Sequence, residues 1–261
     1  MRPLLIVGGG LFGSLAAAYA RHKGIEAHVF DAGLEGAASP AAAGLFQEKW
    51  AGKKFRPHYH RALPLLEKLY PLESVCLTCD DGSQETLLFL PPRLVLEPHP
   101  LRQRVTSVGD GWLEADGRRY EGWVYVAAGI WCRQFVPHLP VQSKAGAAFA
   151  FPGEREGRLH QFAPRRQAIV FVRDPGTTYF SDGTAEPAYE PKHDRQTLAR
   201  AAQMGLTEPI ARCWGCRPYT PGGPHFQRLG ERLWLATGGR KLGTIFGASC
   251  ARRLIEDELC L

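Results

Sequence analysis

The chain lacks any run of eighteen apolar residues, so we expect no helix that spans a membrane. Its Lys and Arg residues never occur in runs longer than two, so we expect no binding to nucleic acid, although the formal net charge is +6. No histidines have the spacing of metal ligands on a helix, and no serine has the glycine-flanked setting of a hydrolase nucleophile. We therefore expect no metal site. The positive charge suits a small anionic ligand such as a dinucleotide or a carboxylate.

The chain has 7 cysteines, an odd number, and they are irregularly spaced. Cys76/Cys79 and Cys213/Cys216 form two C-x-x-C pairs, which are found in both zinc sites and redox sites. About 130 residues separate the pairs, far more than in a zinc ribbon, so a shared zinc site is excluded. A redox pair remains an alternative at either position. Buried or incidental thiols in a reducing cytoplasm are the simpler interpretation.

With 261 residues, 44% of them hydrophobic, the chain is long enough to bury a full core in one large domain or two interleaved ones. An N-terminal secretory signal is imitated by Arg2, the apolar run after it and the Ala-Tyr-Ala sequence at 18–20, with its two small residues. Four glycines break this run, and a second strand at 27–30 needs the first strand as its partner. We therefore interpret the N-terminal segment as part of the fold.

The first thirty-one residues carry the most informative pattern in the chain. A buried strand at 3–7 leads into a glycine turn and an alanine-rich helix, and a second strand at 27–30 ends in Asp31. This order of elements is typical of a β-α-β unit that binds a dinucleotide.

Each glycine of the turn has a physical role in such a unit. Gly8 permits the tight turn, Gly10 lets a pyrophosphate approach the backbone, and Gly13 allows the helix to pack closely on the strand. The free N–H groups at the start of the helix then face the phosphates. Asp31, eighteen residues after Gly13, is placed to accept hydrogen bonds from ribose hydroxyls.

The rest of the chain alternates strands, turns and helices. Hydrophobic patterns predict strands at 75–77, 86–90, 105–108, 112–115, 119–121, 123–129, 168–172, 177–181 and 233–236, and helices at 58–70, 194–204 and 248–259. The segment 123–129 is continuously apolar and ends in glycine, which is typical of a central parallel strand whose carboxyl end meets a ligand. Residues 141–190 predict a mostly antiparallel sheet in a second domain.

Four segments, in chain order, resemble one family of flavoproteins. Residues 37–45 (AASPAAAGL) resemble the family's segment under the flavin, and 126–131 (VAAGIW) its "VVAAGAW" strand end. Residues 214–221 (WGCRPYTP) resemble its "W-x-G-x-R-P-x-T-P" segment, and 238–243 (GGRKLG) its "GHFRNG" loop. The last two motifs are the specific ones. The chain is similar to the FAD-dependent D-amino-acid oxidase family, nearest to glycine oxidase and sarcosine-oxidase-like members.

This resemblance implies an α/β fold with a Rossmann-like FAD-binding domain and a mostly antiparallel substrate-domain sheet, as in glutathione-reductase-2-like flavoproteins. It places the FAD-binding domain at 1–50, 100–140 and 225–261, and a smaller substrate or cap domain at 51–99 and 141–224. No cysteine lies in the segment 238–243, which we call the closing loop, so we expect FAD to be held without a covalent bond.

Twenty-one residues are assigned to FAD binding from the glycine turn and the resemblance together. They are Gly8, Gly10, Leu11, Phe12, Gly13, Asp31, Ala32, Ala38, Ser39, Ala43, Gly44, Leu45, Val105, Ala128, Gly129, Trp131, Gly239, Arg240, Leu242, Gly243 and Thr244.

The chain departs from the family in ways that concern the substrate side. It is a shortened member, compressed between residues 45 and 105. The family's "DG-x-P-x-IG" appears as Gly-Gly-Pro-His-Phe at 222–226, and the histidine of the closing loop is Gly239 here. These changes are compatible with an intact flavin site and an altered substrate pocket.

Two cationic side chains are the predicted catalytic residues. The resemblance puts the family's carboxylate-binding arginine at Arg217, and a guanidinium grips a carboxylate with two parallel hydrogen bonds. Lys241 takes the place of a second substrate-side cation. A structural ion pair and a surface lysine are the respective alternatives. The turn at 243–245 directs backbone N–H groups toward the flavin's pyrimidine oxygen. Tyr179 is more simply a half-buried strand tyrosine than a substrate contact.

The resulting hypothesis is an FAD-dependent enzyme that oxidises a small amine or amino acid to the imine, with oxygen or another electron acceptor reoxidising the flavin. The alternative is a reduced FAD-binding partner subunit, or a protein-modifying flavoprotein, without ordinary oxidase turnover. An NAD-dependent enzyme is a third hypothesis, against which the downstream motifs argue. A partner subunit or a homo-oligomer is left open by the sequence.

Overall fold

The computed structural model describes residues 2–163 and 166–260, and its first sheet confirms the predicted β-α-β unit. The strands of this sheet lie in the order β15-β16-β9-β1-β2, and all neighbours are parallel except β15 and β16. They are β1 (Leu4–Val7), β2 (Ala27–Phe30), β9 (Trp123–Val126), β15 (His225–Arg228) and β16 (Leu233–Thr237). β9 lies between β1 and β16, the central position predicted from its apolar sequence.

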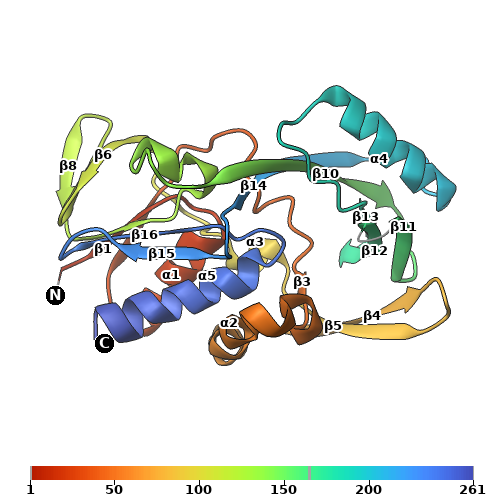
Figure 1. Cartoon of the computed structure of the whole chain (residues 1–261), viewed down its shortest axis with the longest axis horizontal. Coiled ribbons are helices and arrows are strands. Elements are labelled where there is room, and N and C mark those ends of the chain that lie inside the picture. The colour runs from red at the N-terminus through yellow and green to blue at the C-terminus, as the bar shows by residue number, and fades with distance from the viewer. Residues whose placement is uncertain (1, 164–165, 261) are drawn as a thin grey trace.

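The two faces of this sheet have different covers. Leu4 and Ile6 belong to the core formed with helices α1 (Leu11–His22) and α5 (Gly243–Arg252). Leu5 and Val7 point to the other face, as alternation in a strand requires, and pack against the three-stranded sheet. That sheet consists of β6 (Val105–Gly109), β7 (Trp112–Ala115) and β8 (Arg118–Glu121). Figure 1 shows the two helices below the sheet and β6 and β8 above it.

The second sheet has the strand order β14-β10-β13-β12-β11-β4-β5-β3 and curls around the right half of Figure 1. Its pairs are antiparallel except for β11 and β4, so the predicted antiparallel character is confirmed. The strands are β3 (Leu45–Phe46), β4 (Glu73–Cys79), β5 (Gln84–Phe89), β10 (Gln142–Pro152), β11 (Arg158–Ala163), β12 (Arg166–Asp174), β13 (Thr177–Ser181) and β14 (Ala211–Tyr219).

Helix α4 (Pro191–Gln203) covers the outer face of this second sheet through residues such as Phe180 and Ala201. The division into an FAD-binding and a substrate domain stays a prediction. The strands of the first sheet come from 4–30, 123–126 and 225–237, whereas β3 pairs in the second sheet although it precedes residue 50.

Two helix boundaries differ from the prediction. α2 (Glu48–Leu69) begins ten residues before 58, with a break at Gly52, whose φ is +61°. The closing helix begins at Gly243 rather than at 248, and a π-helical turn, η2 (Arg253–Glu258), follows it. Glycine usually argues against a helix. Here a Cβ at Gly247 would lie 2.9 Å from Leu15 Cδ1, so this glycine lets α5 pack closely on α1.

The C-x-x-C pairs lie on strands, so their members point to opposite faces of a sheet. Cys76 and Cys79 are on β4, and Cys213 and Cys216 are on β14. All of these cysteines are free thiols. The geometry therefore argues against a redox pair at either position. Within the described residues, no helix is both long and apolar enough to cross a bilayer.

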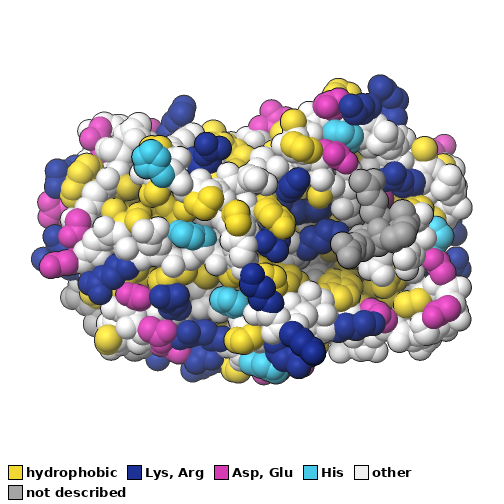
Figure 2. Space-filling model, in the orientation of Figure 1, with side chains coloured by type: hydrophobic (Ala, Val, Ile, Leu, Met, Phe, Trp, Pro, Cys, Tyr) yellow, Lys and Arg dark blue, Asp and Glu magenta, His cyan; other side chains and the backbone are white. Residues whose placement is uncertain are grey.

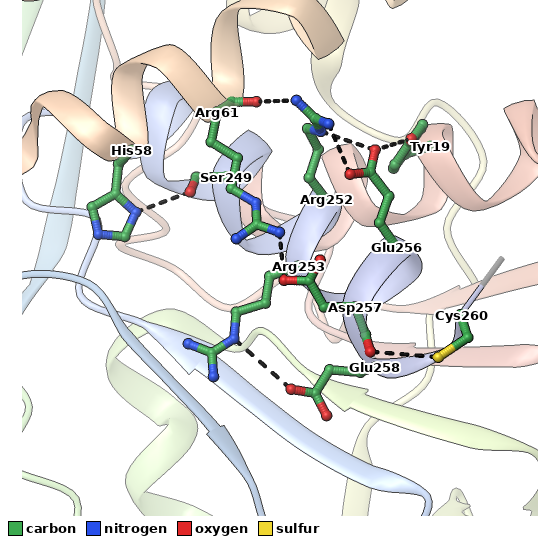
Figure 3. A network of polar contacts seen from close by, with 10 residues as sticks. All are labelled: Tyr19, His58, Arg61, Ser249, Arg252, Arg253, Glu256, Asp257, Glu258 and Cys260. Atoms are coloured by element: carbon green, nitrogen blue, oxygen red, sulfur yellow. Dashed lines mark hydrogen bonds and ion pairs between the residues drawn. The ribbon is translucent and has the colours of Figure 1, made fainter.

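A polar network joins the helices that support the first sheet (Figure 3). Glu256 accepts hydrogen bonds from Tyr19 of α1 and from Arg252, and Arg252 also donates to the Arg61 carbonyl of α2 at 3.0 Å. The hydrogen bonds from Arg252 hold the pKa of Glu256 below its usual range, while burial and the Glu256 contact raise the pKa of Tyr19 to about 12. The network therefore stabilises the packing of α1, α2 and the C-terminal turn at neutral pH.

His58 makes the stability of this packing depend on pH. Its Nδ1 lies 2.9 Å from Ser249 Oγ, and burial, followed by the nearby Arg61 and Arg253, lowers its pKa. The unfolded chain binds a proton at this residue near pH 6.5, so the free energy of unfolding falls as the pH drops through that value. His58→Gln keeps a polar partner for Ser249 but does not titrate. We expect urea denaturation to show a larger loss of stability from about pH 7 to pH 5 in the wild type than in His58→Gln; parallel pH profiles would contradict this.

Candidate active site

A cavity of about 700 Å³ lies where the carboxyl ends of β1, β9 and β16 face the second sheet. Its volume is in the range of about 300–1,000 Å³ that is typical of ligand sites. The walls come from the glycine turn, the segment 37–46, strands β10, β13 and β14, and the loop before α5. Figure 2 shows a hollow on this face, with Lys and Arg side chains around it. The carboxyl ends of parallel strands are where α/β proteins bind their ligands.

The glycine turn brings backbone segments closer together than side chains would allow. Gly8 has a φ of +105°, and a Cβ on it would lie 2.7 Å from the carbonyl oxygen of Ala127. A Cβ on Gly13 would lie 1.9 Å from the carbonyl oxygen of Gly8. Gly13 is the one predicted residue that does not line the cavity, and its contact is the helix–strand packing expected of it.

Asp31 is fixed at the end of β2 by two backbone amides. Its Oδ2 accepts the N–H of Gly9 at 2.9 Å, and its Oδ1 accepts the N–H of Gly33 at 2.8 Å. A carboxylate has further lone pairs, so both oxygens can still accept hydroxyl donors from the cavity.

Ser39 closes the start of α1. Its Oγ accepts the N–H of Leu11 at 2.9 Å, and a Cβ on Gly10 would lie 2.9 Å from the same oxygen. The hydroxyl proton is then free to donate to an anion at the positive end of the helix. Because the helix has no acidic residue in its first turn, nothing there repels a phosphate.

The closing loop is held by Arg240. Its φ is +49°, its N–H donates to the Pro218 carbonyl at 3.0 Å, and its Nη2 donates to the Thr220 carbonyl at 2.7 Å. The guanidinium stacks 4.0 Å from the centre of the Tyr219 ring and 5.6 Å from that of Phe55. Its Nε is buried and has no partner within the described residues. A buried donor without a protein partner in a cavity wall is suited to bind a polar atom of a ligand.

Gly239 stands where the family has a histidine. A Cβ at this position would lie 2.9 Å from Cε2 of Phe12, so the aromatic ring occupies the space beside the loop. The loop then enters α5 at Gly243, and the N–H groups of the first turn face the cavity end lined by Gly243 and Thr244.

The substrate side of the cavity is built on β14 and β10. Arg217 on β14 stands directly opposite Lys144 on β10, and both line the cavity. A Cβ at Gly146 would lie 3.2 Å from an Nη of Arg217, so the glycine leaves room for the guanidinium. Arg217 donates to the Thr184 carbonyl at 3.4 Å. The Nζ of Lys241 is 3.2 Å from where a Cβ on Gly183 would be.

Asp182 holds the segment that Arg217 and Lys241 approach. Its side chain is fully buried, accepts the N–H of Thr184 at 2.9 Å and pairs with Arg200 of α4. The carboxylate therefore faces the outer helix and not the cavity. Its role is to fix the wall at 183–184 against the two cations.

Tyr179 is more buried than the expected half-buried tyrosine, with 4% of its surface exposed. Its hydroxyl donates to the Ala41 carbonyl at 2.9 Å, and the Arg173 guanidinium lies 4.8 Å from the ring centre. Burial raises the pKa of this phenol. Tyr179 therefore stays protonated at neutral pH and fastens the segment 37–46 to the second sheet.

The structure brings the remaining predicted residues together around one cavity, including both proposed catalytic cations. Lys144, Arg104, Trp50 and Phe55 also line the cavity and were missed from the sequence. Lys144 carries no local motif. Only the strand register, which places it opposite Arg217, identifies it.

Comparison with known proteins agrees with this geometry. The chain belongs to the FAD dependent oxidoreductase family, whose profile matches residues 99–256, more than half of its length. A profile described as an NAD(P)-binding Rossmann-like domain matches residues 6–68, the β-α-β unit and the segments after it. No curated protein sequence matches the chain.

Several solved structures share the fold at low sequence identity. Iminodiacetate oxidase from Chelativorans sp. BNC1 aligns with a TM-score of 0.74 and 16% identity over 97% of this chain and 94% of that one. Glycine oxidase from Geobacillus kaustophilus aligns with a TM-score of 0.74 and 16% identity over 98% of this chain and 94% of that one. L-proline dehydrogenase from P. horikoshii aligns with a TM-score of 0.74 and 12% identity over 98% of this chain and 93% of that one.

The protein is therefore an FAD-dependent oxidoreductase, and the hypothesis of an NAD-dependent enzyme is not supported. The residues present fit FAD on observations of the cavity itself. These are the paired acceptor oxygens of Asp31, the start of α1 with the Ser39 hydroxyl and no acidic residue in its first turn, and the Nε of Arg240. The individual binding roles of the cavity residues stay predictions.

Asp31→Asn tests the nucleotide end of the site. Replacing the carboxylate removes a charged acceptor, so we expect the affinity of the apoprotein for FAD to fall about tenfold or more. Flavin fluorescence titration measures this. Glu26→Gln, which removes an exposed charge just before the same strand, is the matched control and should leave the affinity unchanged. Equal affinities of the Asp31 variant and the wild type would exclude a contact between Asp31 and the cofactor.

Proposed function

We propose that the protein oxidises a small amine or amino acid to the corresponding imine, using FAD as the hydride acceptor. The observation that carries the proposal is the position of Arg217, in the wall of the cavity that also contains the glycine turn and Asp31. Solved structures of the same fold are named for oxidation of glycine and iminodiacetate and for dehydrogenation of L-proline, all amino or imino acids.

Arg217 is proposed to bind the substrate carboxylate. The guanidinium presents a planar fork of donors that matches two carboxylate oxygens. Within the described residues, Arg217 donates a long hydrogen bond to the Thr184 carbonyl, and its other N–H groups are left to bind a ligand. Binding of the carboxylate holds the α-carbon and the amine of the substrate in a defined position. This lowers the entropic part of the activation free energy.

The electrostatics of the cavity favour the reactive form of the amine. Among the described residues that line it, five are basic (Arg104, Lys144, Arg217, Arg240 and Lys241), and Asp31 is the single acid. Nearby positive charge disfavours a substrate ammonium and lowers its pKa. The neutral amine has the lone pair that forms the C=N bond as the α-hydrogen departs with both electrons.

FAD, when bound, supplies the acceptor for that hydride. The chain's residues supply binding and orientation, and apolar walls such as Trp50 and Phe55 exclude water from the reacting carbon. The proton on nitrogen then leaves to solvent, and the balance of the step is amine to imine with loss of one hydride and one proton. Imine hydrolysis needs only water.

Lys241 is proposed as a second cation on the substrate side, close to Gly183. Its charge favours binding of anions and reaction of the reduced cofactor with oxygen or another acceptor. The free thiols of the chain support a reducing cytoplasm as its location. The two domains are proposed as predicted from the sequence, one around each large sheet.

Arg217→Ala tests the carboxylate contact in the holoenzyme. Removing one buried charged contact costs on the order of 2–5 kcal/mol, so we expect KM for an amino-acid substrate to rise by at least about thirtyfold with FAD still bound. Steady-state kinetics and the flavin absorbance measure the two effects. Arg212→Ala, on the same strand but paired with Asp194 outside the cavity, is the control. An unchanged KM would remove Arg217 from the pocket.

An anaerobic reduction panel tests the reaction itself. Glycine, sarcosine, D-alanine and D-proline are mixed with the holoenzyme, and bleaching of the flavin absorbance by at least one is expected. If no amine in a broad panel reduces the flavin, the proposal fails in favour of an FAD-binding partner subunit without oxidase turnover.

A further inference from the structure

The substrate side of the cavity holds more positive charge than one carboxylate requires. Four cationic side chains line it on the second sheet and the closing loop: Lys144, Arg217, Arg240 and Lys241. Arg240 is engaged by the Thr220 carbonyl and the Tyr219 ring. The acid of the cavity, Asp31, lies at the end of β2 in the first sheet and binds backbone amides there. It therefore does not neutralise the cations of the second sheet.

The strand register sets Lys144 and Arg217 side by side. They are direct partners in the antiparallel register of β10 and β14, so their side chains stand on the same face of the sheet. Directly opposed residues have Cβ atoms about 4.5–5.5 Å apart, and like charges in this position destabilise a sheet. Within the described residues, Asp182 pairs with Arg200 and Asp194 with Arg212, and neither Lys144 nor Arg217 forms an ion pair with an acidic side chain. An anion bound between or beside the two side chains would relieve this repulsion.

The surroundings keep Arg217 directed at the cavity. The absence of a side chain at Gly146 leaves space for the Arg217 guanidinium, and the Thr184 carbonyl holds it from one side. Asp182 could neutralise this wall, but its carboxylate is committed to Arg200 and Thr197 on the outer helix. The charges of Lys144 and Arg217 therefore belong to the ligand site.

We propose that the substrate carries two carboxylates, an amino- or imino-dicarboxylic acid, with one group held by Arg217 and the second by Lys144. This inference rests on the proposed oxidation of an amine or amino acid and names the class of substrate. Lys144 is a specificity residue in this scheme. It contacts the carboxylate remote from the reacting carbon, so its loss weakens binding of dicarboxylates more than binding of monocarboxylates.

Matched substrate pairs test the proposal in the holoenzyme. The monoamide of iminodiacetate against iminodiacetate, and D-asparagine against D-aspartate, differ in the charge of a second carboxylate at nearly constant size. A charge-assisted contact is expected to lower KM for the dicarboxylate about tenfold or more relative to its partner. Lys144→Gln should abolish this preference by raising KM for the dicarboxylate about tenfold or more relative to its monocarboxylate partner, and Lys144→Arg should retain it. Lys192→Gln, an exposed lysine on α4, is the matched control.

Binding without turnover gives a second readout. Succinate should perturb the flavin spectrum at a lower concentration than butyrate in the wild type, and the difference should vanish in Lys144→Gln. Equal KM values for the paired substrates, or a preference that survives Lys144→Gln, would overturn the inference. A weaker hold on FAD in Lys144→Gln, with selectivity unchanged, would also overturn it by assigning the lysine to the cofactor. Failure of every amine to reduce the flavin would instead refute the proposed function.

Discussion

The close approach of three backbone segments at the glycine turn is the constraint on which the rest of the structure depends. Gly8 lies against Ala127, and Gly13 lies against Gly8, at separations that no side chain tolerates. This contact sets β1 beside β9, directs the start of α1 at the cavity and places Asp31 within reach of the Gly9 amide. Without it, the amides and the carboxylate that suit a dinucleotide would not share one edge of the sheet.

The features that could be predicted from sequence are those governed by local chemistry. The β-α-β unit follows from glycine spacing and apolar runs, and the meander at 105–121 follows from its turn residues. The predicted cofactor residues gather in one place because they follow strand ends or begin helices, where local signals are strong. The resemblance of 214–221 and 238–243 to known motifs identified the family and the two candidate catalytic cations, which hydrophobic periodicity alone does not identify.

What escaped prediction depends on contacts distant in sequence. Lys144 acquires meaning only from the register that sets β10 against β14. The early start of α5 depends on Gly247 packing against Leu15, a tertiary contact that reverses the usual preference of glycine. Tyr179 is fully buried because the segment 37–46 folds over it and accepts its hydroxyl proton. In each case a neighbour from elsewhere in the chain decides the outcome.

Strand β14 has a mechanical consequence for the order of events. At Gly215 a Cβ would lie 2.5 Å from Cα of Ala38, and the N–H of Cys216 donates to the Gly36 carbonyl at 2.8 Å. The strand that carries Arg217 is therefore seated on the loop that faces the cofactor's end of the cavity. Stiffening that loop also stiffens the strand, so the two ligands share one entropic cost and each should tighten the hold on the other.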